Sequence, residues 1–461
     1  MRSLMQRVNR LVLSLITVEF VSLAIVFWAL ATYNHSENIP SHDKLTVALA
    51  FACLTITAVF SIGAYQGSCL RSTRIMVPRI LIAAFASAAF VSVIGPLAES
   101  PVASTVQVVT LAMGASLALL AIRTLGLRLQ SLRQRLKPKV VVLGTGAAAA
   151  ALWRSCGDRH GVRLHRFFEL QEDAPHQGHD GLPAERLEPL PDDFVERMRD
   201  EHVEEIVVAL DDLRCRLPAP SLLECRISGI RVTDHISFLE RSTGRIDLRW
   251  ARSSWLIFSE GFDNRPAQAW AKRGFDVVTS LILLAIFAPL LPLIAMAIAL
   301  DSPGAILYRQ QRVGMDGRLF WIVKFRTMRD GAERDGAPQW ARVADPRITR
   351  AGGFLRRARL DEIPQLVNVL RGDMSMVGPR PERPEFVCEL AAELPYYNER
   401  HKIRPGITGW AQINCEYGST VDDARLKLSY DLFYLKNRSF GLDVLIMMRT
   451  VGTMLFGDGA R

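Results

Sequence analysis

The sequence lacks the cysteine patterns that indicate a disulfide framework or a zinc site. It contains seven cysteines, an odd number, and no Cys-x-x-Cys pair. We therefore expect reduced thiols and a cytosolic environment around the polar parts of the chain. The 461 residues are 22% charged and 49% hydrophobic, which excludes a disordered chain. At roughly 100–200 residues per domain, this length predicts about two to four domains.

Charge is almost missing from four blocks in the first quarter of the chain. Leu11–Tyr33 contains a single acidic residue, Glu19. The other three blocks contain no charged residue: Leu45–Leu70, Ile80–Ala98 and Pro101–Ile122. Each block can supply the roughly 20 apolar residues of a membrane-spanning helix. We predict a four-helix transmembrane bundle within residues 1–135. Glu19 lies near the cationic end of its block, which favours a structural role over a functional intramembrane acid.

Lysine and arginine are distributed unevenly around these blocks. They gather before the first block, between the second and third, and after the fourth. Short cytoplasmic loops carry such an excess of positive charge. Both ends of the four-helix unit are therefore predicted to lie in the cytoplasm, which places the following soluble domains there. This bias also accounts for much of the net charge of +9, so we expect no nucleic-acid partner.

A fifth apolar block, Val277–Leu300, is interrupted by Pro289 and Pro292. Both of its flanks are basic, with Lys272 and Arg273 before it and five cations after it, up to residue 326. A helix that enters the membrane, breaks at proline and returns keeps both flanks on one side. We predict a re-entrant membrane helix over about residues 275–300. The alternative is a kinked fifth span.

Residues 136–265 show the pattern of an α/β domain. Lys139–Ala151 reads as a short strand, then Gly144-x-Gly146-x-x-Ala149, then a helix. Further strands are predicted at Val162–Phe168, Glu204–Leu210 and Gly229–Thr233, which together indicate a Rossmann-like cytoplasmic domain. Gly144 and Gly146 are candidate nucleotide-binding residues, although a structural or regulatory domain is the favoured reading. The stretch His165–Pro191 is predicted to be a loop rather than a metal site.

Adjacent carboxylates mark the most informative part of the second half, residues 266–461. Asp361 and Glu362 precede a predicted short helix, Pro364–Leu370, that ends at Gly372. The amino end of a helix favours anions, and an ionised aspartate can attack phosphorus. The neighbouring carboxylate can hold Mg²⁺ that bridges to phosphate oxygens. For an isolated Asp-Glu pair, helix capping with surface ion pairs would be the simpler interpretation.

Several cations in this half are candidate phosphate ligands. Pro379 and Pro381 flank Arg380, so two residues of fixed φ can present one guanidinium to a phosphate. The remaining candidates are Arg356 and Arg404, followed by Lys324 and Arg326 for a nucleotide. Near the end of the chain, Ser439–Phe456 is too short and too charged to span a membrane comfortably. It is predicted either to lie in the membrane interface or to pack against the domain core.

From about Lys272 onward the chain resembles the bacterial sugar transferases, the monotopic polyprenyl-phosphate phosphoglycosyl transferases. The matching motifs come in the family's order: KRGFD, KFRTM, LRRARLDEIPQL, GDMSMVGPRPERPEF and RPGITGWAQIN. One departure is Ala288-Pro289, where the family often has Ser-Pro. The whole layout resembles the large family members. The details GRIDLRWARSSWLIFSEGF and WAQINCEYGSTVDDARLKLSYDLFYLKN resemble the exopolysaccharide branch associated with PEP-CTERM/exosortase systems.

The resemblance implies a function and a site. A sugar 1-phosphate would move from a UDP-sugar to undecaprenyl phosphate through a phospho-sugar intermediate on Asp361, with UMP released first. Glu362 would bind Mg²⁺, and the re-entrant helix would belong to an α/β, mostly helical catalytic domain. The expected location is the bacterial inner membrane, with the active site facing the cytoplasm. Membrane lipid, a second copy of the chain and downstream glycosyltransferases are the further partners expected. Glucose and galactose are the expected sugars.

Two other functions remain open at this stage. A membrane-bound nucleotide-sugar dehydratase would share the layout of spans and Rossmann-like domain. Its chemistry requires a Tyr-x-x-x-Lys pair, and none of the eight tyrosines is followed by lysine four residues later. A non-enzymatic nucleotide-binding scaffold or sensor of polysaccharide assembly would leave Asp361, Glu362 and the surrounding arginines without a purpose. Assaying transfer of a labelled sugar phosphate into lipid separates these functions.

Overall fold

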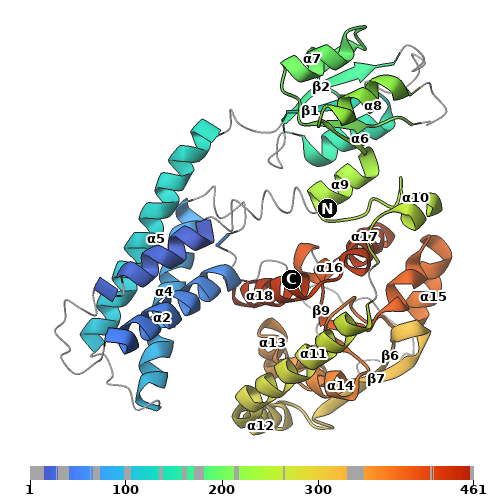
Figure 1. Ribbon diagram of the computed structural model, residues 1–461. Helices are drawn as coiled ribbons and strands as arrows, with labels where there is room; N and C mark the ends of the chain where they lie inside the picture. The colour runs from blue at the N-terminus through green and yellow to red at the C-terminus, as the bar shows by residue number, and fades with distance from the viewer. Residues whose placement is uncertain are drawn as a thin grey trace. The chain divides into compact units, whose positions relative to one another are not determined.

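The computed structural model describes most of the chain (Figure 1). The described residues are 15–26, 28–29, 41–62, 64–65, 73–97, 105–133, 139–157, 163–170, 181–211, 217–262, 265–329, 347–415, 418 and 420–456. The chain divides into an α/β unit, Arg128–Glu260, and a larger unit formed by Arg10–Leu127 and Gly261–Arg461. The α/β unit, the N-terminal helices and the C-terminal domain are described separately below.

The N-terminal region is helical. Its described elements are the helical stretch Leu15–Val26, α2 (Ser41–Ser61), α4 (Thr73–Leu97) and α5 (Thr105–Arg133). Apolar side chains from all four form one core, which includes Leu23, Phe51, Met76, Ile80 and Leu119. The N-terminal arginines and most of the loops that support the predicted orientation lie outside the described residues.

Glu19 is paired inside this helical region. The Arg123 guanidinium on α5 donates to Glu19 through Nε at 2.7 Å, and both side chains are fully buried. Tyr65 donates its hydroxyl to the same carboxylate, and Arg123 also donates to the Ala64 carbonyl at 2.8 Å. A buried carboxylate with two donors is satisfied. These contacts tie the first helical stretch to α5, as expected for a structural role of Glu19.

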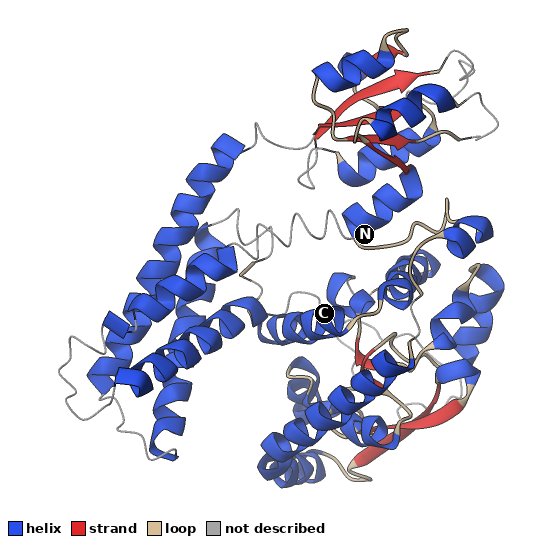
Figure 2. Cartoon of the chain, in the orientation of Figure 1, coloured by secondary structure: helices blue, strands red, loops and turns tan. Residues whose placement is uncertain are grey.

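The α/β unit is built on a parallel five-stranded sheet (Figure 2). Its strands are β1 (Lys139–Leu143), β2 (Arg163–Glu169), β3 (Leu187–Pro189), β4 (Glu205–Val208) and β5 (Arg231–Asp234), in the order β3-β2-β1-β4-β5. The four predicted strands are confirmed. The prediction of a loop over His165–Pro191 is wrong at both ends, because β2 extends to Glu169 and Leu187–Pro189 adds an edge strand. Pro189 is tolerated there because an edge strand needs fewer donors.

Helices cover both faces of this sheet. Alternate residues of β1 point to opposite faces, as strand geometry requires. Val140 and Val142 pack with α6 (Ala147–Cys156) and α9 (His235–Thr243). Val141 and Leu143 pack with α7 (Phe194–Asp200) and α8 (Ala219–Ile227). A short helix, α10 (Ser253–Phe258), ends the unit. Burial on both faces explains the continuous apolar runs of the central strands.

The C-terminal domain combines small sheets with many helices. β6 (Leu307–Val313) and β7 (Leu319–Phe325) form an antiparallel hairpin, and β8 (Ser375–Val377) pairs in parallel with β9 (Gly406–Thr408). The helices after the hairpin are α13 (Arg350–Arg357), α14 (Gln365–Arg371), α15 (Pro384–Glu393), α16 (Trp410–Asn414), α17 (Val421–Asn437) and α18 (Phe440–Phe456). Leu442 and Ile446 of α18 are buried, which agrees with packing against the domain core rather than an interfacial position.

The proline-broken block forms two consecutive helices. α11 (Pro266–Phe287) ends at a 3-10 turn, η3 (Ala288–Leu290), and α12 (Leu291–Asp301) follows directly (Figure 1). Pro289 lies in the turn and Pro292 in the first turn of α12, where a missing N–H costs little. Among the described residues, Pro266–Asp301 is one helical segment long and apolar enough to cross a membrane. Much of its apolar surface is exposed, for example at Ile286 and Leu300.

Both ends of this segment contact the same domain. Near its start, Arg273 donates to the carbonyl oxygens of Val369 and Leu370 at 2.6 and 2.8 Å. At its end, the Asp301 carboxylate accepts from the Ala351 backbone N–H at 2.8 Å. A straight helix of this length would separate its ends by about 50 Å at 1.5 Å per residue. The break at η3 therefore allows the chain to return to the domain that it left.

We expect Gly144→Ala to destabilise the α/β unit. Gly144 has φ +111°, and a Cβ there would lie 2.3 Å from the Ala209 carbonyl oxygen. The matched control is Gly181→Ala, since Gly181 has φ +102° and no atom within 4 Å of its Cβ position. Gly181→Ala should lower the free energy of unfolding by about 1–2 kcal/mol through backbone strain alone. Gly144→Ala should lower it by about 2 kcal/mol more. Hydrogen exchange of the β1 amides measures both, and equal loss of protection would contradict this account.

Candidate active site

Asp361 and Glu362 lie together in a buried 3-10 turn, η5 (Leu360–Glu362). Arg359 precedes the turn with φ +54°, which reverses the chain after α13. The predicted helix after the pair is confirmed to within one residue as α14, which ends at Gly372 with φ +94°. Asp361 is 9% exposed and Glu362 is 7% exposed. Two adjacent carboxyl groups at this depth need positive partners or must be neutral.

Glu362 forms ion pairs with the cations of this site. Lys324 Nζ donates to Glu362 Oε1 at 3.0 Å, and Arg380 Nη2 donates to the same oxygen at 3.2 Å. Arg359 Nη1 lies 3.9 Å from Glu362 Oε2. Burial alone would raise the pKa of Glu362, but these charges outweigh it and hold the pKa well below the usual range. Glu362 is therefore a fixed negative charge.

Asp361 has a different environment. Within the described residues, its carboxyl group has no hydrogen-bond or ion-pair partner. Burial first, and then the negative charge of Glu362, raises the pKa of Asp361 above its ordinary value, although Lys324, Arg356 and Arg380 oppose the shift. Two neighbouring carboxyl groups with pKa values shifted in opposite directions indicate two different roles. The sequence predicted the pair but did not predict that Glu362 would take the cations.

Lys324 lies beside the carboxylate pair because its strand, β7, is hydrogen-bonded to α14. The Asn368 side chain on α14 donates to the Trp321 carbonyl at 2.8 Å and accepts from the Val323 backbone N–H at 3.3 Å. Asn368 is 1% exposed, so both contacts are protected from water. The amide thus acts as an additional strand partner for β7. Sequence reasoning missed this residue, although a buried Asn within an apolar helix is a signal for such a contact.

Arg356 is close enough to Asp361 to influence its pKa. Its Nε donates to the Thr327 hydroxyl at 2.8 Å. Gly352 allows α13 to approach the segment that follows β7, because a Cβ there would lie 2.1 Å from the Thr327 carbonyl oxygen. Thr327 belongs to the KFRTM motif, and its hydroxyl was not predicted to position an arginine.

The loop after β8 presents Arg380 through its backbone. The Pro379 carbonyl accepts from the Gly406 N–H at 2.9 Å, and the Pro381 carbonyl accepts from Arg312 Nη1 at 3.1 Å. The carbonyl of Arg380 itself accepts from Arg400 Nη2 at 3.0 Å. Every residue of Pro379–Arg380–Pro381 is thus held at its carbonyl group. This agrees with the prediction of a rigid loop around one guanidinium.

Two other predicted cations make their contacts elsewhere. Arg326 donates to the carbonyl oxygens of Ser302 and Pro303, at 2.6 and 2.7 Å, directly after α12. Arg404 is exposed and donates to the Gly372 carbonyl at 3.0 Å, at the end of α14. Neither guanidinium has a hydrogen bond to Asp361 or Glu362 among the described residues. Both act here as caps of helix ends.

The glycine loop of the α/β unit is occupied by the protein's own anion. The Asp211 carboxylate accepts from the backbone N–H groups of Ala147 and Ala148, both at 2.8 Å. A Cβ at Gly146 would lie 2.2 Å from Asp211 Oδ2. These are the amides at the amino end of α6 that the fingerprint offers to a phosphate. Close packing thus gives Gly144 and Gly146 a structural reason, and their nucleotide-binding role stays a prediction.

Comparison with known proteins places this site in a family. Residues 267–457 match the family described as bacterial sugar transferase. A UDP-N-acetylgalactosamine-undecaprenyl-phosphate N-acetylgalactosaminephosphotransferase of Aeromonas hydrophila is 42% identical over 240 residues, which are 52% of this chain and 56% of the relative. An undecaprenyl-phosphate glucose phosphotransferase of Komagataeibacter xylinus is 34% identical over 342 residues, 72% of this chain and 61% of the relative.

A third relative is covered more completely. A UDP-glucose:undecaprenyl-phosphate glucose-1-phosphate transferase of Caulobacter vibrioides is 45% identical over 198 residues, 42% of this chain and 74% of that protein. The chain belongs to the bacterial sugar transferase family. It spans less than two thirds of the length of the first two relatives. The matched residues contain Asp361, Glu362, Lys324 and Arg380.

We expect Lys324→Met to lower stability by about 2 kcal/mol at neutral pH, because Glu362 keeps only part of its positive surroundings. A carboxylate whose pKa is lower in the folded state stabilises the fold above its unfolded pKa of about 4.3. That stabilisation disappears as the pH falls through the lowered folded pKa. The difference between variant and parent should therefore be largest above about pH 5 and shrink below about pH 4.

Thermal unfolding in detergent across this pH range measures the effect. Lys402→Met, at an exposed lysine of the same domain, is the control and should change little at any pH. A loss of stability in Lys324→Met that does not vary with pH would mean that the lysine acts by packing and not by its charge.

Proposed function

We propose that the chain transfers a sugar 1-phosphate from a UDP-sugar to undecaprenyl phosphate, as an early membrane step of exopolysaccharide synthesis. The observation that carries the proposal is the unequal pair in η5. Glu362 is neutralised by Lys324 and Arg380, while Asp361 is buried and unpaired within the described residues. The names of the relatives, which are undecaprenyl-phosphate sugar phosphotransferases, support the same reaction.

The proposed reaction has two displacement steps. An Asp361 carboxylate oxygen attacks the sugar-bearing phosphorus of the UDP-sugar, the P–O bond to the other phosphate breaks, and UMP leaves with the electron pair. A phosphate oxygen of undecaprenyl phosphate then attacks the same phosphorus. The bond to Asp361 breaks, which regenerates the carboxylate and releases the lipid-linked sugar. Asp361 must be ionised to attack, and the charges of Lys324, Arg356 and Arg380, which oppose the rise of its pKa, favour that form.

The cations around the pair stabilise the charge of the phosphoryl group. Arg380 and Lys324 lie on the Glu362 side, and Arg356 lies near Asp361. Mg²⁺ is held in proteins by one or two carboxylates and by substrate phosphates, and Glu362 can offer Oε2, because Lys324 and Arg380 both donate to Oε1. Glu362 would hold the ion, which would neutralise phosphate charge. No cluster of three or more acidic, His or Cys side chains occurs in the described part of the chain, so the remaining ligands would come from substrate and water.

The break in the apolar segment supports a re-entrant position in the bacterial inner membrane. Arg273 and Asp301, near its two ends, contact the same domain. The exposed apolar side chains lie between these anchors, for example at Ile282, Ile286 and Met296. The uncharged part of α11, residues 277–287, and all of α12, residues 291–301, are each shorter than the roughly 20 residues needed to cross a bilayer. The site would then face the cytoplasm, where a soluble donor meets a lipid phosphate.

The same proposal covers the rest of the chain. The N-terminal helices expose apolar residues such as Ile25 and Leu117 outside their shared core, as four membrane spans would. The strand order and covering helices of the α/β unit support a Rossmann-like domain, and its cytoplasmic location stays a prediction. A homodimer, downstream glycosyltransferases and the PEP-CTERM-associated branch stay predictions.

We expect Asp361→Asn to abolish UMP release and lipid product, a loss of at least about 1,000-fold, because an amide cannot act as the nucleophile. The assay uses purified protein in nanodiscs with Mg²⁺, with and without undecaprenyl phosphate. The donor panel contains UDP-glucose, UDP-galactose and UDP-N-acetylgalactosamine. Asp422→Asn, at an 86% exposed aspartate, is the matched control and should keep full activity.

The outcomes separate the alternatives. Lipid-dependent UMP release from one donor would identify the reaction and the sugar together. Retained turnover in Asp361→Asn would rule out the covalent intermediate. Folded parent protein that releases no UMP from any donor would instead favour the scaffold or sensor function.

We also expect both ends of the apolar segment to be accessible from one side of the membrane. Single cysteines at Trp270, which is 77% exposed, and at exposed Ala305 are introduced into a chain without its native cysteines. An impermeant maleimide should label both in inside-out vesicles and neither in intact cells. Labelling of the two cysteines from opposite sides would mean that the segment crosses the membrane.

A further inference from the structure

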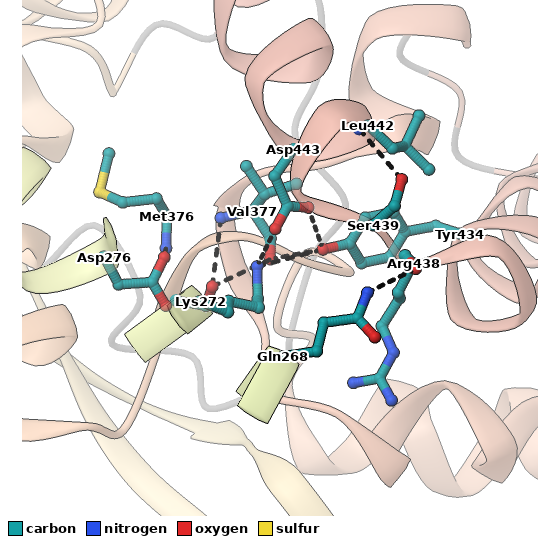
Figure 3. A network of polar contacts seen from close by, with 11 residues as sticks. Gln268, Lys272, Asp276, Met376, Val377, Tyr434, Arg438, Ser439, Leu442 and Asp443 are labelled. Atoms are coloured by element: carbon teal, nitrogen blue, oxygen red, sulfur yellow. Dashed lines mark hydrogen bonds and ion pairs between the residues drawn. The ribbon is translucent and has the colours of Figure 1, made fainter. Parts of the chain in front are cut away.

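We propose that Lys272 is a positioning residue that fixes Arg380 by tying the base of α11 to β8. The inference rests on the proposed transferase function and deepens it. In the sequence, Lys272 is a basic flank of the apolar block and the first residue of the KRGFD motif, and neither observation gave it a contact. In the structure its ammonium group contacts protein atoms from three elements (Figure 3). The positive charge of Lys272 is therefore paired inside the domain.

The contacts of Lys272 converge on the carbonyl group of Val377. Lys272 Nζ donates to Asp443 Oδ2 at 2.7 Å, to the Tyr434 hydroxyl at 3.2 Å and to the Val377 carbonyl at 3.2 Å. The Tyr434 hydroxyl lies 2.6 Å from Asp443 Oδ1 and 3.1 Å from the same carbonyl oxygen. Asp443 is 3% exposed, so the ion pair is shielded from water. The Val377 carbonyl oxygen thus lies within hydrogen-bond distance of the Lys272 ammonium, the Tyr434 hydroxyl and, from its own strand, the Ser375 hydroxyl.

A stripe of polar residues on α11 extends this attachment along β8. Asp276 lies one turn after Lys272 and accepts from the Met376 backbone N–H at 3.1 Å. Ser280 lies one turn further and donates its hydroxyl to the Met376 sulfur at 3.4 Å. Positions i, i+4 and i+8 share one face of a helix. Asp276 and Ser280 are fully buried in an otherwise apolar helix, which a membrane anchor alone would not require.

β8 leads directly to Arg380. Val377 is followed by Gly378 and then by Pro379–Arg380–Pro381. Gly378 is packed so closely that a Cβ would lie 2.3 Å from the Arg404 carbonyl oxygen. A displacement of Val377 therefore cannot be absorbed in this short, restrained link and shifts Arg380 against Glu362. Arg273, the next residue of α11, holds the end of α14 through Val369 and Leu370. Consecutive residues of α11 thus hold the segments that carry Arg380 and the carboxylate pair.

The test is a double-mutant cycle on UMP release by the full-length protein in nanodiscs. Lys272→Met removes the ammonium group with little change in side-chain length. We expect kcat to fall about 10- to 100-fold while KM for the UDP-sugar changes less than about threefold, as for a misplaced catalytic group. In an Arg380→Met background, Lys272→Met should lower kcat by less than about twofold, because the guanidinium that Lys272 positions is already absent.

Tyr434→Phe provides a second, milder variant should Lys272→Met fail to fold. It deletes one hydroxyl that contacts the same carbonyl and should lower kcat about 3- to 10-fold, again only when Arg380 is present. Gln268→Leu is the matched control. Gln268 lies one turn before Lys272 and donates to the Arg438 carbonyl at 3.2 Å, so it ties α11 to the domain without contacting β8. It should keep the parental kcat.

Three results would overturn the proposal. Parental kcat in Lys272→Met would show that the lysine is dispensable. An equal fold-loss with and without Arg380 would show that it acts independently of that residue. An equal loss of kcat in Gln268→Leu and Lys272→Met would show that both residues act only by anchoring α11 to the domain. Failure of the transferase function would be recognised separately, because the parent protein would then release no UMP.

Discussion

The C-terminal domain depends on how it compensates the charge of one buried carboxylate. Glu362 is 7% exposed and cannot remain charged without compensation. Lys324 on β7 and Arg380 after β8 supply that compensation from segments far apart in the sequence. Breaking the arrangement would leave an unpaired charge in a low-dielectric environment. The same electrostatic requirement thus joins these two segments at Glu362 and leaves Asp361 without an ion pair among the described residues.

The surrounding structure orients these cations mainly through backbone atoms. Arg400 holds the carbonyl of Arg380 and is itself paired with Asp431, with Nη2 at 2.8 Å from Oδ2. Burial raises the pKa of Asp431 to about 6 despite that arginine. Asn368 replaces a missing strand neighbour of β7. The backbone on either side of these cations is thus fixed independently of their contacts with Glu362.

The sequence predicted the parts of the molecule that follow from local patterns. Four strands of the α/β unit and the short helix after Glu362 are confirmed, because alternation, glycine and proline act over a few residues. The edge strand Leu187–Pro189 was missed, since it is three residues long and follows a segment rich in turn-forming residues. The motifs also named Lys324, Arg356 and Arg380 as candidate phosphate ligands, and the structure places these three near the pair.

Long-range contacts were beyond such reasoning. Nothing near Arg326 or Arg404 in the sequence indicates that they cap α12 and α14. Lys272 and Asp443 are 171 residues apart, and only the folded chain brings them together. The unequal roles of Asp361 and Glu362 likewise depend on which neighbour the distant cations reach. Family resemblance supplied those roles, and the geometry gives a physical reason for them.

The Asp211 carboxylate would compete with a nucleotide phosphate for the glycine loop of the α/β unit. Its carboxylate is tethered to the same chain and occupies both amides at the amino end of α6. A tethered group of this kind acts at an effective concentration on the order of millimolar or more. A nucleotide at micromolar concentration would have to displace it and would also leave a carboxylate to be rehydrated. Any nucleotide that binds at this glycine loop would therefore bind in competition with the carboxylate of Asp211.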